Sequence, residues 1–152
     1  MAAGEFNILA DQGANYVLYF VYETNSSDAI DLDSYTGRMQ VRRSSYSTDI
    51  LIGITGDTTS GVVTGGGVTG SYSGNDGVVG VGGMLLNASN GGNTGATGAT
   101  GGVYVSIGSD IMKNCPSGRH LYDIELIAGE VVTRVLQGRF EVRAEVTRLC
   151  HK

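Results

Sequence analysis

The side chains in this sequence best suited to binding a metal are two cysteines and two histidines, at Cys115, His120, Cys150 and His151. Thiolates and imidazoles are the usual ligands of zinc, so these four residues could form one site. Their spacing does not match a zinc finger or a zinc ribbon, because Cys115 stands alone and Cys150 is adjacent to His151. We therefore predict free thiols, exposed imidazoles and no bound metal.

The sequence also offers little for nucleophilic catalysis, which needs a Ser or Cys nucleophile, a base and an orienting acid. The only histidines are His120 and His151, and His151 is one of the last two residues of the chain. No nucleophile-elbow motif is present. We expect no catalytic residue, and a protein that is not an enzyme.

Two further patterns match ligand sites on paper. Gly65–Gly70 has the G-x-G-x-x-G spacing of a dinucleotide loop, but that loop must open a helix, and no helical pattern follows it. Asp28, Asp31 and Asp33 lack the glycine and the terminal glutamate of a calcium loop. We predict no cofactor, and a solvated turn at the three aspartates.

The charge balance argues against nucleic acid as a partner. Fifteen acidic and ten basic residues give a net charge of −5, and the basic residues gather in 38–43 and 134–148, where acids are interleaved in the second group. Binding to phosphates needs an excess of Lys and Arg. The longest apolar stretch, 16–22, is too short to span a bilayer, and no targeting segment is visible. We expect a soluble chain made in a cytoplasm, with no membrane partner.

Strict alternation of apolar and polar residues predicts strands at 37–43, 49–54 and 103–107. Residues 15–23 are apolar on both faces, which predicts a central strand that is covered on both sides. The only helical pattern is short and lies at 109–114.

The C-terminal part has the clearest pattern. Strands are predicted at 120–127, 130–137 and 139–147, with turns at Gly129 and Gly138. This predicts a three-strand meander with one buried face and one solvated face. In the last strand, alternation directs Phe140 inward and Arg139 outward.

The middle of the chain, 56–102, is rich in glycine and almost uncharged. A three-residue glycine period at 92–101 has no proline, so a collagen helix is not expected. Three alternatives stay open: a flexible loop, extra strands, or a segment that docks on a neighbouring subunit. Because glycine is costly to order, we expect this segment to be mobile in isolation and better ordered in an assembly.

These patterns predict an all-β fold, a sandwich or barrel, in one domain over 1–152 with 56–102 as a glycine-rich insertion.

Two flanking stretches carry a resemblance to a known family. The first runs from Ile8-Leu-Ala-Asp-Gln-Gly-Ala14 to Tyr35-Thr-Gly-Arg-Met-Gln-Val-Arg42. The second runs from Leu121-Tyr-Asp-Ile-Glu-Leu126, through Gly138-Arg-Phe, to Val146-Thr-Arg148. Together they resemble small virion proteins of tailed phages with an immunoglobulin-like domain, a module similar to the N-terminal domain of baseplate upper proteins and of some tail-fibre proteins.

The resemblance implies an immunoglobulin-like antiparallel β-sandwich in a structural subunit of a tail, baseplate or tail fibre, or an adaptor between them. It implies no catalytic residues. The partners it implies are other virion proteins and copies of this chain, in a homo-oligomer within a symmetric particle made in the host bacterial cytoplasm. The long glycine-rich insertion departs from the family.

Two other functions stay open. The chain could be a capsid decoration protein, which would be present in many more copies than a tail component. It could also be a receptor- or carbohydrate-binding module, since eight Tyr residues could supply stacking surfaces.

Overall fold

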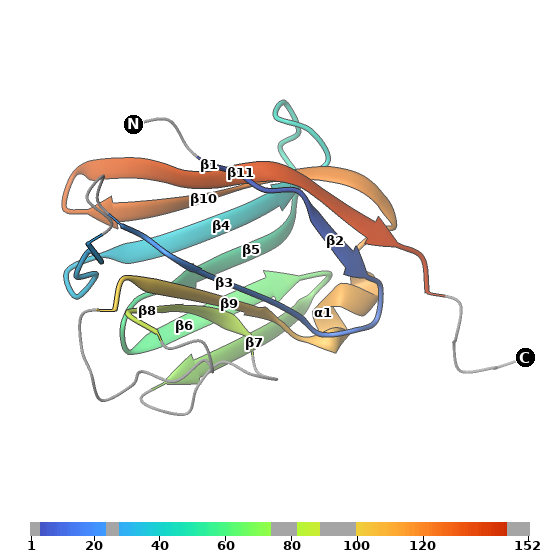
Figure 1. Ribbon diagram of the computed structural model, residues 1–152. Helices are drawn as coiled ribbons and strands as arrows, with labels where there is room; N and C mark the ends of the chain where they lie inside the picture. The colour runs from blue at the N-terminus through green and yellow to red at the C-terminus, as the bar shows by residue number, and fades with distance from the viewer. Residues whose placement is uncertain (1–3, 24–27, 74–81, 89–99, 146–152) are drawn as a thin grey trace, which may run out of the picture.

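Strands dominate the computed structural model of the chain (Figure 1), which describes residues 4–23, 28–73, 82–88 and 100–145. Within these residues the strands form an eight-stranded sheet and a three-stranded sheet. The large sheet curls from β11 to β7, and the small sheet covers its inner face. The chain is therefore all-β with a sandwich-like arrangement, as the alternating patterns predict.

The large sheet has the order β1-β11-β10-β4-β5-β6-β7, and β2 also pairs with β11. Its strands β1 and β2 run parallel to β11, whereas the other pairs are antiparallel. Its members are β1 (Gly4–Glu5), β2 (Ile8–Asp11), β4 (Thr36–Arg42), β5 (Ile50–Gly56), β6 (Ser60–Gly65), β7 (Val68–Ser73), β10 (Gly118–Ala128) and β11 (Val131–Arg143).

The small sheet has the order β3-β9-β8 and is antiparallel throughout. Its members are β3 (Tyr16–Val21), β8 (Gly83–Leu86) and β9 (Gly102–Ile107). A short helix, α1 (Ser109–Asn114), follows β9 and leads into β10. This helix lies where the sequence predicts it.

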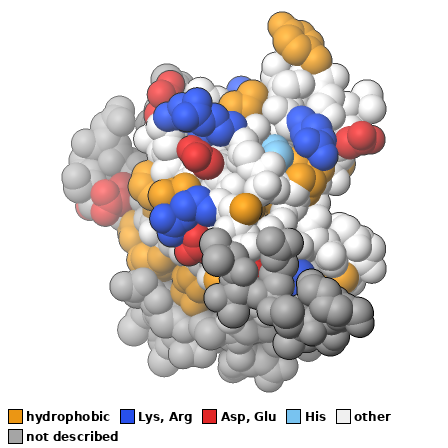
Figure 2. Space-filling model, turned by 90° about the vertical axis from the view of Figure 1, so that its right-hand side faces the viewer, with side chains coloured by type: hydrophobic (Ala, Val, Ile, Leu, Met, Phe, Trp, Pro, Cys, Tyr) orange, Lys and Arg blue, Asp and Glu red, His pale blue; other side chains and the backbone are white. Residues whose placement is uncertain are grey.

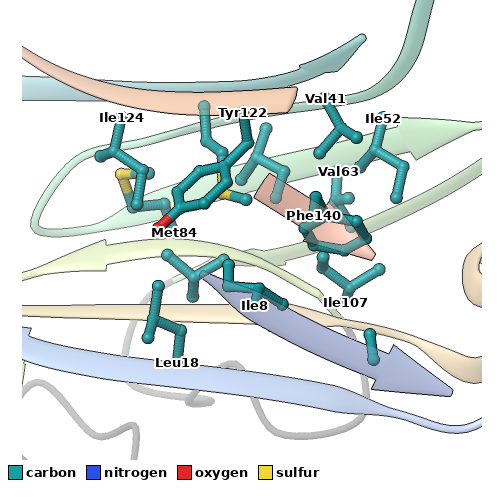
Figure 3. Packing of buried hydrophobic residues seen from close by; sticks show 14 of the residues in the cluster. Ile8, Leu18, Val41, Ile52, Val63, Met84, Ile107, Tyr122, Ile124 and Phe140 are labelled. Atoms are coloured by element: carbon teal, nitrogen blue, oxygen red, sulfur yellow. The ribbon is translucent and has the colours of Figure 1, made fainter. Parts of the chain in front are cut away.

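One hydrophobic core lies between the two sheets. Figure 3 shows side chains from both sheets, among them Leu18 and Tyr122, meeting in the space between the ribbons. The Phe140 ring is fully buried and makes edge-on contacts with the rings of Tyr16 and Tyr122, at centroid distances of 6.1 and 6.4 Å. Such pairs stabilise a core beyond their buried area, by about 0.5–1.5 kcal/mol each.

The alternation in β4 and β10 is confirmed. Met39 and Val41 of β4 are fully buried, as are Ile124 and Leu126 of β10, while the residues between them face outward. The predicted turn at Gly129 is also present, with a positive φ of 60°.

The prediction of a central strand at 15–23 is wrong. In the described residues β3 is an edge strand that pairs only with β9, and its outward residues Val17 and Val21 are exposed. The strand covered on both sides is β9, whose six residues are all buried. Because β9 lies between β3 and β8, it has a neighbouring strand on both edges, and its residues are buried on both faces.

The predicted meander is also wrong, because β11 runs without a turn from Val131 to Arg143. Gly138 lies inside this strand, opposite Tyr122 of β10. A Cβ atom at Gly138 would collide with the carbonyl oxygen of Phe6, in the segment that joins β1 to β2. This glycine therefore permits a close approach of two backbones rather than a turn.

Strands occupy much of the glycine-rich insertion. Of the three alternatives, extra strands are present in its described part, as the end of β5 and all of β6, β7 and β8. Gly66 and Gly67 have positive φ angles and form the two-residue turn between β6 and β7, so Gly65–Gly70 belongs to a hairpin. Residues 74–81 and 89–99 lie outside the described residues, and the expected gain of order in an assembly stays a prediction.

Asp57 stabilises the turn between β5 and β6. Its carboxylate accepts hydrogen bonds from the backbone N–H groups of Thr59 and Ser60, at 2.7 and 2.8 Å, and from the Thr59 hydroxyl. Partial burial acts to raise the pKa of Asp57, but the three hydrogen bonds outweigh it and hold the pKa below its usual value.

We expect Asp57→Ala to lower the free energy of unfolding by about 1 kcal/mol at pH 7, because two backbone donors lose their acceptor. Since the folded-state pKa is lowered, the contribution is complete above the unfolded pKa and is lost as pH falls through the folded one. Urea unfolding from pH 6 to pH 3 should show a smaller pH dependence in the variant than in the parent. Equal pH dependence in the two proteins would mean that this carboxylate contributes nothing.

Candidate interaction surfaces

Cys115 and His120 lie close in sequence, but both are buried structural residues. Burial raises the pKa of the Cys115 thiol to about 11, although the charge of Arg43 acts to lower it. The Nε2 atom of His120 lies 2.7 Å from the carbonyl oxygen of Pro116. The prediction of an exposed imidazole is therefore wrong for His120. No group of three or more His, Cys, Asp or Glu residues in the described part could hold a metal, and residues 150 and 151 lie outside it.

The acidic turn is tied to the sheets by Asn87, a residue that the sequence patterns did not single out. The Asp31 carboxylate accepts hydrogen bonds from the Asp33 backbone N–H and from the Asn87 side-chain amide. The Asn87 side-chain oxygen in turn accepts from the backbone N–H groups of Leu32 and Gly101. Asp31 and Asp33 are exposed, as expected for a solvated turn, and Asp31 also fixes this loop to the end of the small sheet.

The outer face of the large sheet carries a groove of about 550 Å³, which we call the arginine groove. Leu121 of β10 lies in it, directly between Arg42 of β4 and Arg139 of β11 in the strand register. Asp123 and Arg134 line it further along and form an ion pair at 3.3 Å. Burial raises the pKa of Asp123, while the charge of Arg134 acts to lower it.

The arginine groove is lined mainly by polar and charged side chains. The Arg42 guanidinium donates hydrogen bonds to the Gln40 side chain and to the Ser47 carbonyl. Arg139 has no ion pair within the described residues. The groove's serines, Ser44 and Ser45, have no histidine beside them in its lining. Its chemistry suits anionic or hydroxyl-bearing ligands.

Charges of both signs are mixed elsewhere on the surface. Figure 2 shows one face, on which basic and acidic side chains lie beside one another with hydrophobic side chains between them. Arg38 pairs with Glu125 at 2.6 Å and Arg143 with Asp11 at 2.7 Å. Pairs as exposed as the second add little to stability.

The second candidate surface is the side of β3 that faces away from β9, which we call the β3 edge. No strand in the described part of the chain pairs with this side. Val17 and Val21 are 43% and 39% exposed there. The strand lacks the devices by which natural sheets protect an edge: it has no charged residue, no proline and no bulge.

Backbone geometry directs hydrogen-bonding groups outward along the β3 edge, where they bond to no other described residue. The Tyr22 N–H donates to the Gly101 carbonyl at 2.8 Å, on the β9 side. Bonded and non-bonded pairs alternate in an antiparallel ladder. The N–H and C=O groups of Val17, Tyr19 and Val21 therefore point away from β9. They form a template for another strand.

The other sheet edges in the described residues differ from the β3 edge. The β8 strand is completely buried, and its Met84 carbonyl accepts a hydrogen bond from the Tyr72 hydroxyl. The β1 and β2 strands carry Glu5 and Asp11. The β7 strand consists largely of Gly, Ser and Thr. The β3 edge is therefore the most apolar open edge among the described strands.

No helix in the described residues has both the length and the apolar character needed to cross a membrane. No protein-family model matches the chain, and no similar protein was found among the curated ones.

Proposed function

We propose that the protein is a structural subunit of a tailed-phage virion, in the tail, baseplate or tail fibre or as an adaptor between them. It acts by assembling with other virion proteins and with copies of itself. The observation that carries the assembly role is the open, apolar and uncharged β3 edge. An edge of this kind pairs readily with another strand, and natural monomers avoid it.

The phage assignment is supported by the resemblance of the flanking sequences. Three of the resembling segments lie on neighbouring strands, β4, β10 and β11, where Leu121 is opposite both Arg42 and Arg139. They therefore form one continuous part of the large sheet. An immunoglobulin-like relationship for the two sheets belongs to the same proposal and depends on that resemblance.

A non-enzymatic role is also part of the proposal. The Cys115 thiol is buried and its pKa is raised, which makes it a poor nucleophile at neutral pH. His120, the only histidine in the described residues, is buried against Pro116.

The arginine groove favours one second candidate, a receptor- or carbohydrate-binding module. Arg139 and the side chains of Gln40, Asp123 and Gln137 could bind sugar hydroxyls or a carboxylate. Such a module should bind host-surface glycans saturably as the isolated protein, and Arg139→Ala should weaken that binding. A structural subunit should show no such binding.

The proposal is tested by immunogold labelling of purified phage particles with an antibody to this chain, together with its copy number from quantitative mass spectrometry. Label on the tail or its tip with tens of copies per particle is the expected result. Label over the head with hundreds of copies would identify a capsid decoration protein instead. Absence of the chain from intact particles would overturn the structural role.

A further inference from the structure

The sequence of β3 and the residue after it has an internal symmetry. The order Tyr16-Val-Leu-Tyr19-Phe-Val-Tyr22 places Tyr opposite Tyr, Val opposite Val, and Leu opposite Phe about its centre at Tyr19. We infer that β3 pairs antiparallel with β3 of a second copy of this chain, across a two-fold axis at Tyr19. This inference rests on the proposed assembly function, since it names the first partner of the same edge.

The direction of the backbone groups fits this pairing. Val17, Tyr19 and Val21 direct their N–H and C=O groups away from β9, because the Tyr22 N–H is bonded to Gly101 on the β9 side. In the two-fold arrangement Tyr19 faces Tyr19 of the second copy. Val17 faces Val21 of the second copy, and Val21 faces its Val17. All three positions then form hydrogen-bonded pairs at once, without a shift of register.

The side chains fit as well. Val17 and Val21, exposed by 43% and 39%, would cover each other across the axis on the outer face of the joined sheet. On the inner face, Leu18 of one copy lies opposite Phe20 of the other, so both cores meet at the junction. Apolar cross-strand pairs of this kind each stabilise a sheet by a few tenths of a kcal/mol to about 1 kcal/mol.

The contact itself brings no like charges together, although each copy carries a net charge of −5. No residue of β3 is charged. The nearest acid, Glu23, would lie opposite Asn15 of the second copy rather than opposite another Glu, because both positions are four residues from Tyr19. The contact is isologous and closes on itself, so it yields a dimer and leaves no free β3 edge for further growth.

The test measures the dimer dissociation constant of the full chain by analytical ultracentrifugation. Val21→Glu should raise it by about tenfold or more, because each dimer would lose two Val–Val contacts across the axis and place a charged side chain beside Val17 of the other copy. Val62→Glu is a matched control: Val62 is also 39% exposed, but it lies on β6, which is paired on both sides. This control should dimerise like the parent, and circular dichroism should show that both variants are folded.

A double variant tests the register. With Val17→Lys added to Val21→Glu, each new Lys would face a new Glu of the other copy, and dimerisation should return. Within one copy these two positions are too far apart along the strand to pair with each other. A parent chain that is monomeric at all concentrations, or a Val21→Glu variant that dimerises as well as the parent, would overturn the inference.

The same variants separate this inference from the proposed function. Suppose that the parent is monomeric, and that Val21→Glu fails to enter phage particles while the Val62→Glu control enters them. The β3 edge then pairs with another virion protein, and the assembly role stands. If the parent dimerises but Val21→Glu and Val62→Glu both enter particles normally, the dimer is real but is not needed for assembly.

Discussion

Gly56→Ala should destabilise the protein far more than Gly53→Ala, although both positions lie on β5. A Cβ atom at Gly56 would collide with the backbone carbonyl of Met84 on β8, which cannot move without disturbing the small sheet. A Cβ atom at Gly53 would meet only the side chains of Ile50 and Thr64, at ordinary contact distances of 3.5 and 3.7 Å. We expect Gly56→Ala to lower the free energy of unfolding by about 3 kcal/mol, the upper end of the usual cost of a forced overlap in a packed core, because the obstacle is backbone.

The free energy of unfolding of Gly53→Ala should lie within about 1 kcal/mol of the parent's, because alanine fits there and reduces the entropy of the unfolded chain. Urea unfolding of the two variants at neutral pH measures the difference directly. Equal losses in the two variants would show that β8 does not lie against β5 as described.

The glycines of the insertion therefore have a packing role. A Cβ atom at Gly61 of β6 would lie 2.8 Å from the same Met84 carbonyl, so neighbouring strands of the large sheet use glycine where β8 crosses them. Met84, Leu85 and Leu86 of β8 are completely buried at this crossing. Backbone contact between the two sheets explains why apolar clusters and glycines alternate in this part of the sequence.

Phe140→Ala should lower the free energy of unfolding by about 3–5 kcal/mol, the usual range for a buried Phe. The ring has no exposed surface, and it joins Tyr16 of the small sheet to Tyr122 of the large sheet. Its removal would leave a cavity between the two sheets and end both aromatic contacts. The midpoint of thermal unfolding should fall by about 10 °C, given the size of the chain.

Tyr46→Ala is the control for this experiment, since Tyr46 is 94% exposed and its loss should change stability by less than about 0.5 kcal/mol. Comparable effects of the two substitutions on thermal unfolding would contradict the position of Phe140 in the core.

Much of the fold could be predicted from local patterns. The buried residues of β4 and β10 follow the alternation of the sequence, because each strand has one face on the core and one in solvent. The short helix could also be predicted. The burial pattern of these elements repeats over residues that are close together in the chain, so it is visible in the sequence.

The errors have a common physical cause. Gly138 is compatible with a turn, but its role is set by Phe6, which is 132 residues earlier in the chain. The apolar residues on both faces of residues 15–23 are compatible with a central strand, but β9 takes that place. In each case the deciding contact is distant in sequence, and no periodicity reports it.

Only some features of the candidate surfaces could be predicted from the sequence. Outward-facing arginines on the C-terminal strand could be predicted, but their meeting with Arg42 and Leu121 depends on the register of three strands. The role of Asn87 could not be predicted, because its partner Leu32 is 55 residues away. The open side of β3 could not be predicted either, because it depends on the order of strands in the small sheet.

The most direct test of assembly through the β3 edge is amide hydrogen exchange, followed by NMR for the separate chain and by mass spectrometry for the assembled one. In a dilute monomer the amides of Val17, Tyr19 and Val21 should exchange quickly, while those of Leu18 and Phe20, bonded to β9, should exchange slowly. On dimerisation or incorporation into particles the first three should become protected. If they are already as slow as Leu18 in the monomer, or stay fast in the assembly, the β3 edge is not the surface through which this protein assembles.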